Sequence, residues 1–204
     1  MLAMRVGSRS PLGLELSMRA TAQRCGRIGA AVAVLVLAWS GPIGRPALAQ
    51  DPLFATMAVT HEKSEPEAPD FALRTPDGRT LTLSTFRGRI VLLNFWATWC
   101  APCRVEMPSM ERLHQEFKDV GLVILAVDLD ESPKLVAKFT QDFRLTFPAL
   151  LDTGSRVASR YEVRGLPTTI LIDRRGRVVG TAIGPRDWAS AGGPALIRSL
   201  LGQR

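Results

Sequence analysis

The sequence predicts an α/β fold in which helices flank one mixed central sheet, and three observations carry this prediction. Strand and helix patterns alternate over residues 90–161, two strand patterns then form a hairpin, and a helical pattern ends the chain. Strands separated by helices pair in parallel, whereas a hairpin adds antiparallel pairs. The 204 residues, 46% of them hydrophobic and 22% charged, suit one compact domain of ordinary size plus some excess at an end.

A short hairpin and a buried strand are expected first. Residues 71–74 and 81–83 flank the pair Asp77-Gly78, and Asp-Gly supplies the positive φ of a tight hairpin turn. The run Ile90–Trp96 is continuously apolar with β-branched and aromatic residues. Such a run is typical of a strand that is buried on both faces.

A helix is expected from Pro102 to Val120, because apolar residues recur there at three- and four-residue steps, and Pro108 is expected to kink it. The later elements follow from the same two periodicities. They are a strand at 122–129, a helix at 133–143, a strand at 149–151, a short helix at 155–161, a hairpin of 168–173 and 178–183, and a last helix at 194–201.

Residues 1–49 are expected to be an export signal or a membrane anchor. A basic segment precedes the uncharged run Ile28–Trp39, and a small-x-small site ends at Ala49, which is the order of a cleaved signal peptide. Extended to Ile43, the run reaches 16 residues, whereas a bilayer span needs about 20. An anchor of residues 28–43 and a buried core helix therefore stay open as alternatives.

Two further expectations concern the start of the chain. The basic segment is long for an export signal, so we expect translation to start at Met18 rather than at Met1. Residues 50–68 are rich in Pro, Glu and small residues, and we expect them to form a linker or a frayed end before a domain of residues 69–204.

The net charge of +7 belongs mostly to the leader, since residues 1–49 hold six arginines and one glutamate. The remaining residues carry a net charge of +2, and their basic and acidic side chains are interspersed along the sequence. They form no basic patch that could bind a phosphate backbone, so no nucleic-acid partner is expected. An exported domain functions where disulfides persist, and two of the three cysteines lie in it.

Cys100 and Cys103 form a Cys-Ala-Pro-Cys motif between the buried strand and the helix that follows it. A thiol at a helix N-terminus faces unpaired N–H groups and the positive end of the helix dipole, which favours its thiolate. The second thiol lies one turn further along, close enough to attack a mixed disulfide. Cys100 is therefore the predicted nucleophile and Cys103 the resolving thiol of a redox-active disulfide.

Other uses of the two cysteines stay open. An inert disulfide over so short a loop would stabilise the fold by only about 2 kcal/mol. A zinc site needs four ligands, and only His61, in the expected linker, and His114 could accompany the two cysteines, so no metal or other cofactor is expected. A peroxide-reducing cysteine normally has Thr three residues before it, whereas Thr98 is two before.

The motif has specific surroundings. Phe95–Arg104 surrounds the two cysteines, Glu106-Met107-Pro108 follows, and Val163–Thr169 contains a Leu-Pro-Thr-Thr sequence. These segments resemble the thioredoxin-fold thiol-disulfide oxidoreductases of the TlpA/ResA/CcmG type, TlpA most of all, from about Pro69 to the C-terminus. The resemblance implies a thioredoxin-like three-layer sandwich with an N-terminal hairpin and a central strand–helix insertion at 128–151.

The resemblance also implies roles for individual residues. Pro167 matches a cis proline that lies against the dithiol, and the backbone of Leu166 would pair with a substrate strand. Trp99 is expected to pack beside the disulfide and to contact substrate. Glu106 matches an acidic residue near the cysteines and would accept their proton, although a solvated helix glutamate stays open. Asn94 stands where thioredoxin has a buried Asp.

A carboxylate near the cysteines disfavours the thiolate, and Ala-Pro contains no cation, so a reductase is expected. The clients implied are cysteine-containing periplasmic proteins, either apocytochromes c or copper-site assembly proteins. The implied electron donor is a membrane thiol reductase of the CcdA/DsbD kind. The alternative is a periplasmic copper chaperone that binds Cu(I) through the same two thiolates, with His114 as a third ligand to test.

Overall fold

The structure is a computed structural model that describes residues 52–129 and 132–202. The expected leader, with the cleavage site at Ala49 and the anchor at 28–43, lies outside the described residues. Within those two ranges, no helix is both long enough and apolar enough to cross a bilayer.

The described residues form fourteen short elements. They are α1 (Pro52–Thr56), β1 (Thr60–His61), β2 (Ala72–Arg74), β3 (Thr80–Thr82), the 3-10 turn η1 (Leu83–Phe86), β4 (Ile90–Trp96), α2 (Ala101–Phe117), β5 (Leu122–Leu129), α3 (Pro133–Asp142), β6 (Ala149–Asp152), α4 (Arg156–Arg160), β7 (Thr168–Ile172), β8 (Val178–Ile183) and α5 (Gly192–Gly202). Every element expected between residues 71 and 201 is present, with its ends moved by a few residues. Helix α2 stays helical through Pro108.

One mixed sheet has the strand order β1-β8-β7-β4-β5-β6-β2-β3. Strand β4 lies inside it, parallel to β5 and antiparallel to β7, and β5 is parallel to β6. All seven residues of β4 are buried, as its apolar run predicts. Because β4, β5 and β6 run in one direction, their carboxyl ends lie at the same edge of the sheet.

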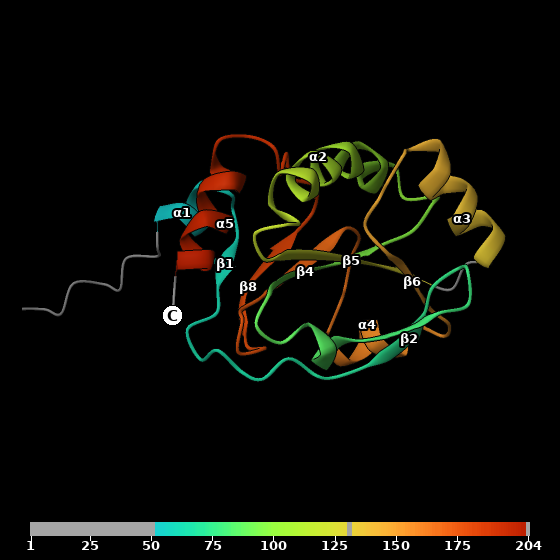
Figure 1. The fold of residues 1–204 in the computed structure, drawn as a ribbon, viewed down its shortest axis with the longest axis horizontal. Helices are drawn as coiled ribbons and strands as arrows, with labels where there is room; N and C mark the ends of the chain where they lie inside the picture. The colour runs from blue at the N-terminus through green and yellow to red at the C-terminus, as the bar shows by residue number, and fades with distance from the viewer. Residues whose placement is uncertain (1–51, 130–131, 203–204) are drawn as a thin grey trace, which may run out of the picture. The chain divides into compact units, whose positions relative to one another are not determined.

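Two hydrophobic clusters lie on the two faces of this sheet. Ile90, Leu92 and Trp96 of β4 pack with residues of α1, α2, α3 and α5 in one cluster. The alternate residues Val91 and Leu93 pack with α4 in the other. Figure 1 shows α2, α3 and α5 on one side of the sheet and α4 on the other. This confirms the predicted α/β sandwich with a mixed sheet.

The expectation of a linker at 50–68 is wrong for the part that the structure describes. Phe54, Met57 and Val59 are buried in the core, and β1 pairs antiparallel with β8 at the edge of the sheet. The physical reason is that these few apolar side chains follow one another at helical and then strand spacing, which composition alone does not reveal. The folded domain therefore includes residues from Pro52 onward.

Candidate redox-active site

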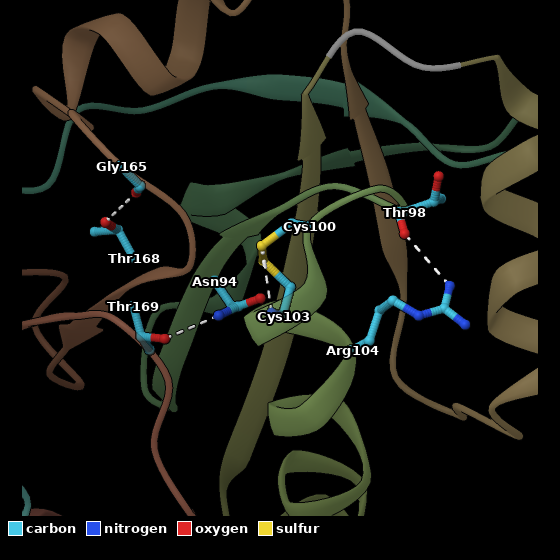
Figure 2. Close-up of a disulfide and its surroundings, with 8 residues drawn as sticks. All are labelled: Asn94, Thr98, Cys100, Cys103, Arg104, Gly165, Thr168 and Thr169. Atoms are coloured by element: carbon cyan, nitrogen blue, oxygen red, sulfur yellow. Dashed lines mark hydrogen bonds between the residues drawn. A yellow bond between two sulfur atoms is a disulfide. The ribbon is translucent and has the colours of Figure 1, made fainter.

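The dithiol motif lies where β4 leads into α2. Cys100 is the N-cap of α2, and Pro102 occupies its first turn, where a proline costs no helical hydrogen bond. The two cysteines form a disulfide with their Cα atoms 5.3 Å apart. Cys100 Sγ also accepts a hydrogen bond from the Cys103 N–H at 3.3 Å (Figure 2). The predicted disulfide is thus present at a helix N-terminus, where the Cys103 N–H donates to the first sulfur.

The two cysteines differ slightly in their exposure to solvent. Cys100 is 5% exposed, whereas Cys103 is 0% exposed. An incoming thiol or disulfide can therefore meet Cys100 first.

The loop before β7 lies beside the disulfide (Figure 2). The Leu166–Pro167 peptide bond is cis, as the resemblance implies. Pro167 is buried and Leu166 is half-buried against both hydrophobic clusters. The Thr168 hydroxyl donates to the Gly165 carbonyl at 2.7 Å, which holds the loop closed around the proline. Neither the N–H nor the carbonyl of Leu166 bonds to another backbone group among the described residues.

The two tryptophans of the motif have different surroundings. Trp96 is completely buried, with its ring centroid 4.6 Å from that of Phe139. Trp99 is 71% exposed, so most of its ring faces solvent. Val105, on the first turns of α2, is 76% exposed as well. The surface next to the disulfide therefore carries exposed apolar side chains.

Glu106 is not a solvated helix glutamate, because it is only 1% exposed. One turn along α2 from Cys103, it lies on the same face of the helix. Its Oε1 accepts a hydrogen bond from the indole N–H of the buried Trp188, and Oε2 has no partner among the described residues. Burial raises the pKa of Glu106 to about 7, although Trp188, Arg186 and Asn94 act to lower it. This carboxyl can exchange a proton near neutral pH.

The segment that supplies Trp188 is firmly held. The Trp188 backbone N–H donates to the Ser109 hydroxyl at 3.1 Å, and that hydroxyl donates to the Glu106 carbonyl at 2.7 Å. The guanidinium of Arg186 donates to five backbone carbonyls, including those of Met57 and Ala58. No pattern in the sequence indicates that this segment contacts Glu106.

Asn94 is the polar residue of β4 on the face toward α2, since side chains alternate along a strand. It is completely buried, and its Nδ2 donates to the Thr169 hydroxyl at 2.9 Å (Figure 2). Its Oδ1 has no partner among the described residues. The amide therefore links the strand that leads to the dithiol with the strand that follows the cis proline.

The residues needed for a metal site do not gather here. Among the described residues, no three His, Cys, Asp or Glu side chains come together in a way that could hold an ion. His114 lies eleven residues beyond Cys103 on α2, about 16 Å away at 1.5 Å per residue. Its ring packs edge-on against Phe147. It is too distant to share a copper ion with the two sulfurs.

Comparisons with known proteins agree with this site. Residues 65–181 match the AhpC/TSA family. The chain is 42% identical over 118 residues to the thiol-disulfide oxidoreductase ResA of Bacillus anthracis, a match that covers 58% of this chain and 68% of that protein. It is 37% identical over 148 residues to ResA of a Bacillus cereus strain, a match that covers 72% and 82%.

Solved structures share the fold as well. A thiol:disulfide interchange protein from Chlorobium tepidum TLS matches with a TM-score of 0.62 and 27% identity, over 69% of this chain and 99% of that one. StoA from Bacillus subtilis matches with a TM-score of 0.51 and 26% identity, over 58% and 90%. The chain therefore belongs to the AhpC/TSA family and is a thioredoxin-like thiol-disulfide oxidoreductase of the ResA/DsbE/TlpA type, with Cys100–Cys103 as its redox-active disulfide.

Proposed function

We propose that this protein is an extracytoplasmic reductase that passes two electrons from the reduced Cys100–Cys103 pair to a disulfide of a client protein. The observation that carries the proposal is Glu106, a buried carboxyl with a pKa of about 7 one helical turn from Cys103. A carboxylate at this place repels a thiolate. A dithiol is a strong oxidant when its reduced form is stabilised as a thiolate. The carboxylate opposes that stabilisation, so it favours a reducing protein.

The exchange proceeds in two displacements. The Cys100 thiolate attacks one sulfur of the client disulfide, forms a mixed disulfide and releases the other client sulfur as a thiolate. The Cys103 thiolate then attacks Cys100, forms the Cys100–Cys103 disulfide and releases the second client thiolate. Two electrons and, after protonation of the client, two protons pass from protein to client. The greater exposure of Cys100 and its place at the helix N-terminus support this order.

Glu106 acts in the second displacement as the acceptor of the Cys103 proton. Cys103 is completely buried, so water does not reach its thiol readily. A carboxylate with a pKa of about 7 is a base of suitable strength at neutral pH, because it is ionised in a large fraction of molecules and still binds a proton well. The indole of Trp188 orients this carboxyl.

The client segment binds beside the cis proline. The backbone N–H and carbonyl of Leu166 are free of backbone partners among the described residues, so they can pair with an extended segment of the client. Pro167, which is buried in this loop, would hold it against the disulfide, and the exposed Trp99 would offer an apolar surface next to it. Such pairing would place a client cysteine over Cys100.

The clients we propose are extracytoplasmic cysteine-containing proteins, either apocytochromes c or copper-site assembly proteins. A membrane thiol reductase of the CcdA/DsbD kind would reduce the disulfide again after each turnover. The support for this compartment is the export signal or anchor expected in residues 1–49. The support for the clients is the resemblance of the motifs around Cys100 and Leu166.

The reduction potential tests the proposal. The purified protein is equilibrated with dithiothreitol or glutathione buffers, and tryptophan fluorescence reports the ratio of dithiol to disulfide. A potential below about −220 mV supports a reductase, and Glu106→Gln should raise it. A potential near about −120 mV would mean that the protein forms disulfides in its clients, and the role assigned to Glu106 would then be wrong.

A further inference from the structure

A basic cleft lies between β2, the end of β6 and α4, away from the disulfide. Its volume is about 870 Å³, and its lining includes the apolar residues Leu73 and Leu151. Three exposed arginines also line it, and Figure 1 shows the elements that carry them, β2 and α4, side by side. We call it the arginine cleft, after Arg74, Arg156 and Arg160.

The arginine cleft presents positive charge without an exposed carboxylate among its lining residues. Asp152 is the one acidic residue of the lining, but it is 1% exposed and accepts hydrogen bonds from the backbone N–H groups of Val157 and Ala158. None of the three arginines forms an ion pair with any described residue, whereas Arg79, Arg87 and Arg198 elsewhere do. The side chains of the cleft are therefore able to receive an anionic partner.

The cleft lies at the same edge of the sheet as the dithiol. It contains the carboxyl end of β6, which lies two strands from β4 at the same edge of the sheet, about 10 Å away sideways. Helix α4 leads directly into the cis-proline loop, with Arg164 following Arg160 by four residues. The six residues from Arg160 to Leu166 span at most about 20 Å. An extended client segment of about six residues that pairs with Leu166 can therefore reach as far as Arg160.

The spacing of the arginines fits an extended peptide. Arg156 and Arg160 lie four residues apart on α4, so their Cα atoms rise by about 6 Å along the helix axis. Alternate residues on one face of an extended chain are about 6.7 Å apart. The spacing of two carboxylates in the pattern acid-x-acid thus matches the spacing of Arg156 and Arg160 along α4.

We infer that the arginine cleft binds an acidic segment of the client protein, close in sequence to the cysteine that Cys100 attacks. This rests on the proposed reductase function and gives it a substrate class, namely clients with an acid-x-acid pattern within about six residues of the reactive cysteine. A concave site with apolar walls suits a peptide better than the flat surface of a membrane.

The test uses the full-length reduced protein and two matched peptides. Each peptide contains an internal disulfide, with Glu-x-Glu or Gln-x-Gln about six residues from the first cysteine. Stopped-flow fluorescence gives the second-order rate constant of reduction. At about 20 mM salt we expect the Glu peptide to react about 10-fold faster, and this preference should vanish near 0.5 M salt, where charges are screened.

The variant Arg74→Gln/Arg156→Gln should abolish this preference and leave the rate with the Gln peptide unchanged. These two arginines are chosen over Arg160 because the Arg160 guanidinium donates to the Asp70 carbonyl at 2.8 Å and so helps to hold the fold together. The matched control is Arg112→Gln/Arg198→Gln, which removes two exposed positive charges outside the cleft and should keep the preference.

Three outcomes decide the matter. A full preference for the Glu peptide in Arg74→Gln/Arg156→Gln would overturn the inference. The inference would also be overturned if that variant no longer bound phosphatidylglycerol vesicles but still preferred the Glu peptide, because the cleft would then bind a membrane surface. If neither peptide is reduced, the proposed function fails separately. Peptide binding to the cleft is then measured without thiol-disulfide exchange, by fluorescence anisotropy with the oxidised protein and a Glu peptide whose cysteines are replaced by serine. Equal affinity of the wild type and the variant for this peptide would refute the inference.

Discussion

Replacement of Trp188 by Phe removes the hydrogen bond that the indole donates to the Glu106 side chain and retains an aromatic ring in the core. The indole N–H donates to Oε1 of a carboxyl that is 1% exposed, and Oε2 has no partner among the described residues. A hydrogen bond to a charged group contributes about 1.5–3 kcal/mol. Since about 1.4 kcal/mol corresponds to one pH unit, the pKa of Glu106 should rise by about one to two pH units above its value near 7.

The assay is the reduction potential measured from about pH 5.5 to 9.5. A carboxyl whose pKa differs between the dithiol and the disulfide forms adds a bend to the plot of potential against pH. We expect the bend near pH 7 in the wild type, at a higher pH in Trp188→Phe, and none in Glu106→Gln. Adding Trp188→Phe to Glu106→Gln should change nothing further.

Trp96→Phe is the matched control for this series. Trp96 is also completely buried, but its indole N–H has no hydrogen-bond partner among the described residues. The variant Trp96→Phe should show the bend at the same pH as the wild type. A bend at the same pH in Trp188→Phe and wild type would refute the role of the indole in setting the proton affinity of Glu106.

Three other results are expected. Because the folded pKa of Glu106 lies above its usual 4.5, its contribution to stability is complete below about pH 4.5 and lost as pH rises through about 7. The free energy of unfolding of Glu106→Gln, measured with urea, should therefore rise by about 3 kcal/mol relative to that of the wild type between pH 4.5 and 7. Parallel plots of unfolding free energy against pH for the two proteins would contradict this. Phe54→Ala should cost about 3–5 kcal/mol if the N-terminal segment is part of the core, whereas the exposed Leu135→Ala should cost little. Cys103→Ser should trap a mixed disulfide on Cys100, seen by non-reducing mass spectrometry, and an absence of any adduct with a disulfide peptide would count against the two displacements.

The parts of the fold that the sequence predicts are those governed by local patterns. The seven apolar residues of β4 and the three- and four-residue steps of α2 each lie within one element, so their periodicity is visible without the structure. The same holds for the two cysteines at the start of α2. Their chemistry depends on a helix end that the sequence already marks.

The parts that escaped prediction depend on contacts between distant residues. Glu106 and Trp188 are 82 residues apart, and no periodicity in either segment indicates that they meet. The burial of Glu106 follows from that meeting, so a solvated glutamate could not be rejected beforehand. Phe54 and Val59 escaped for a related reason, because they fill space beside Gly180, where the absence of a side chain leaves room for them.

The N-terminal end of the described domain and the arginine cleft are separated by most of the width of the sheet. Strand β1 is the first strand of the sheet, and β6 lies five positions further along it. At about 4.8 Å per strand, the two are about 24 Å apart. Pro52, where the described domain begins next to β1, and the arginine cleft therefore lie toward opposite ends of the sheet (Figure 1).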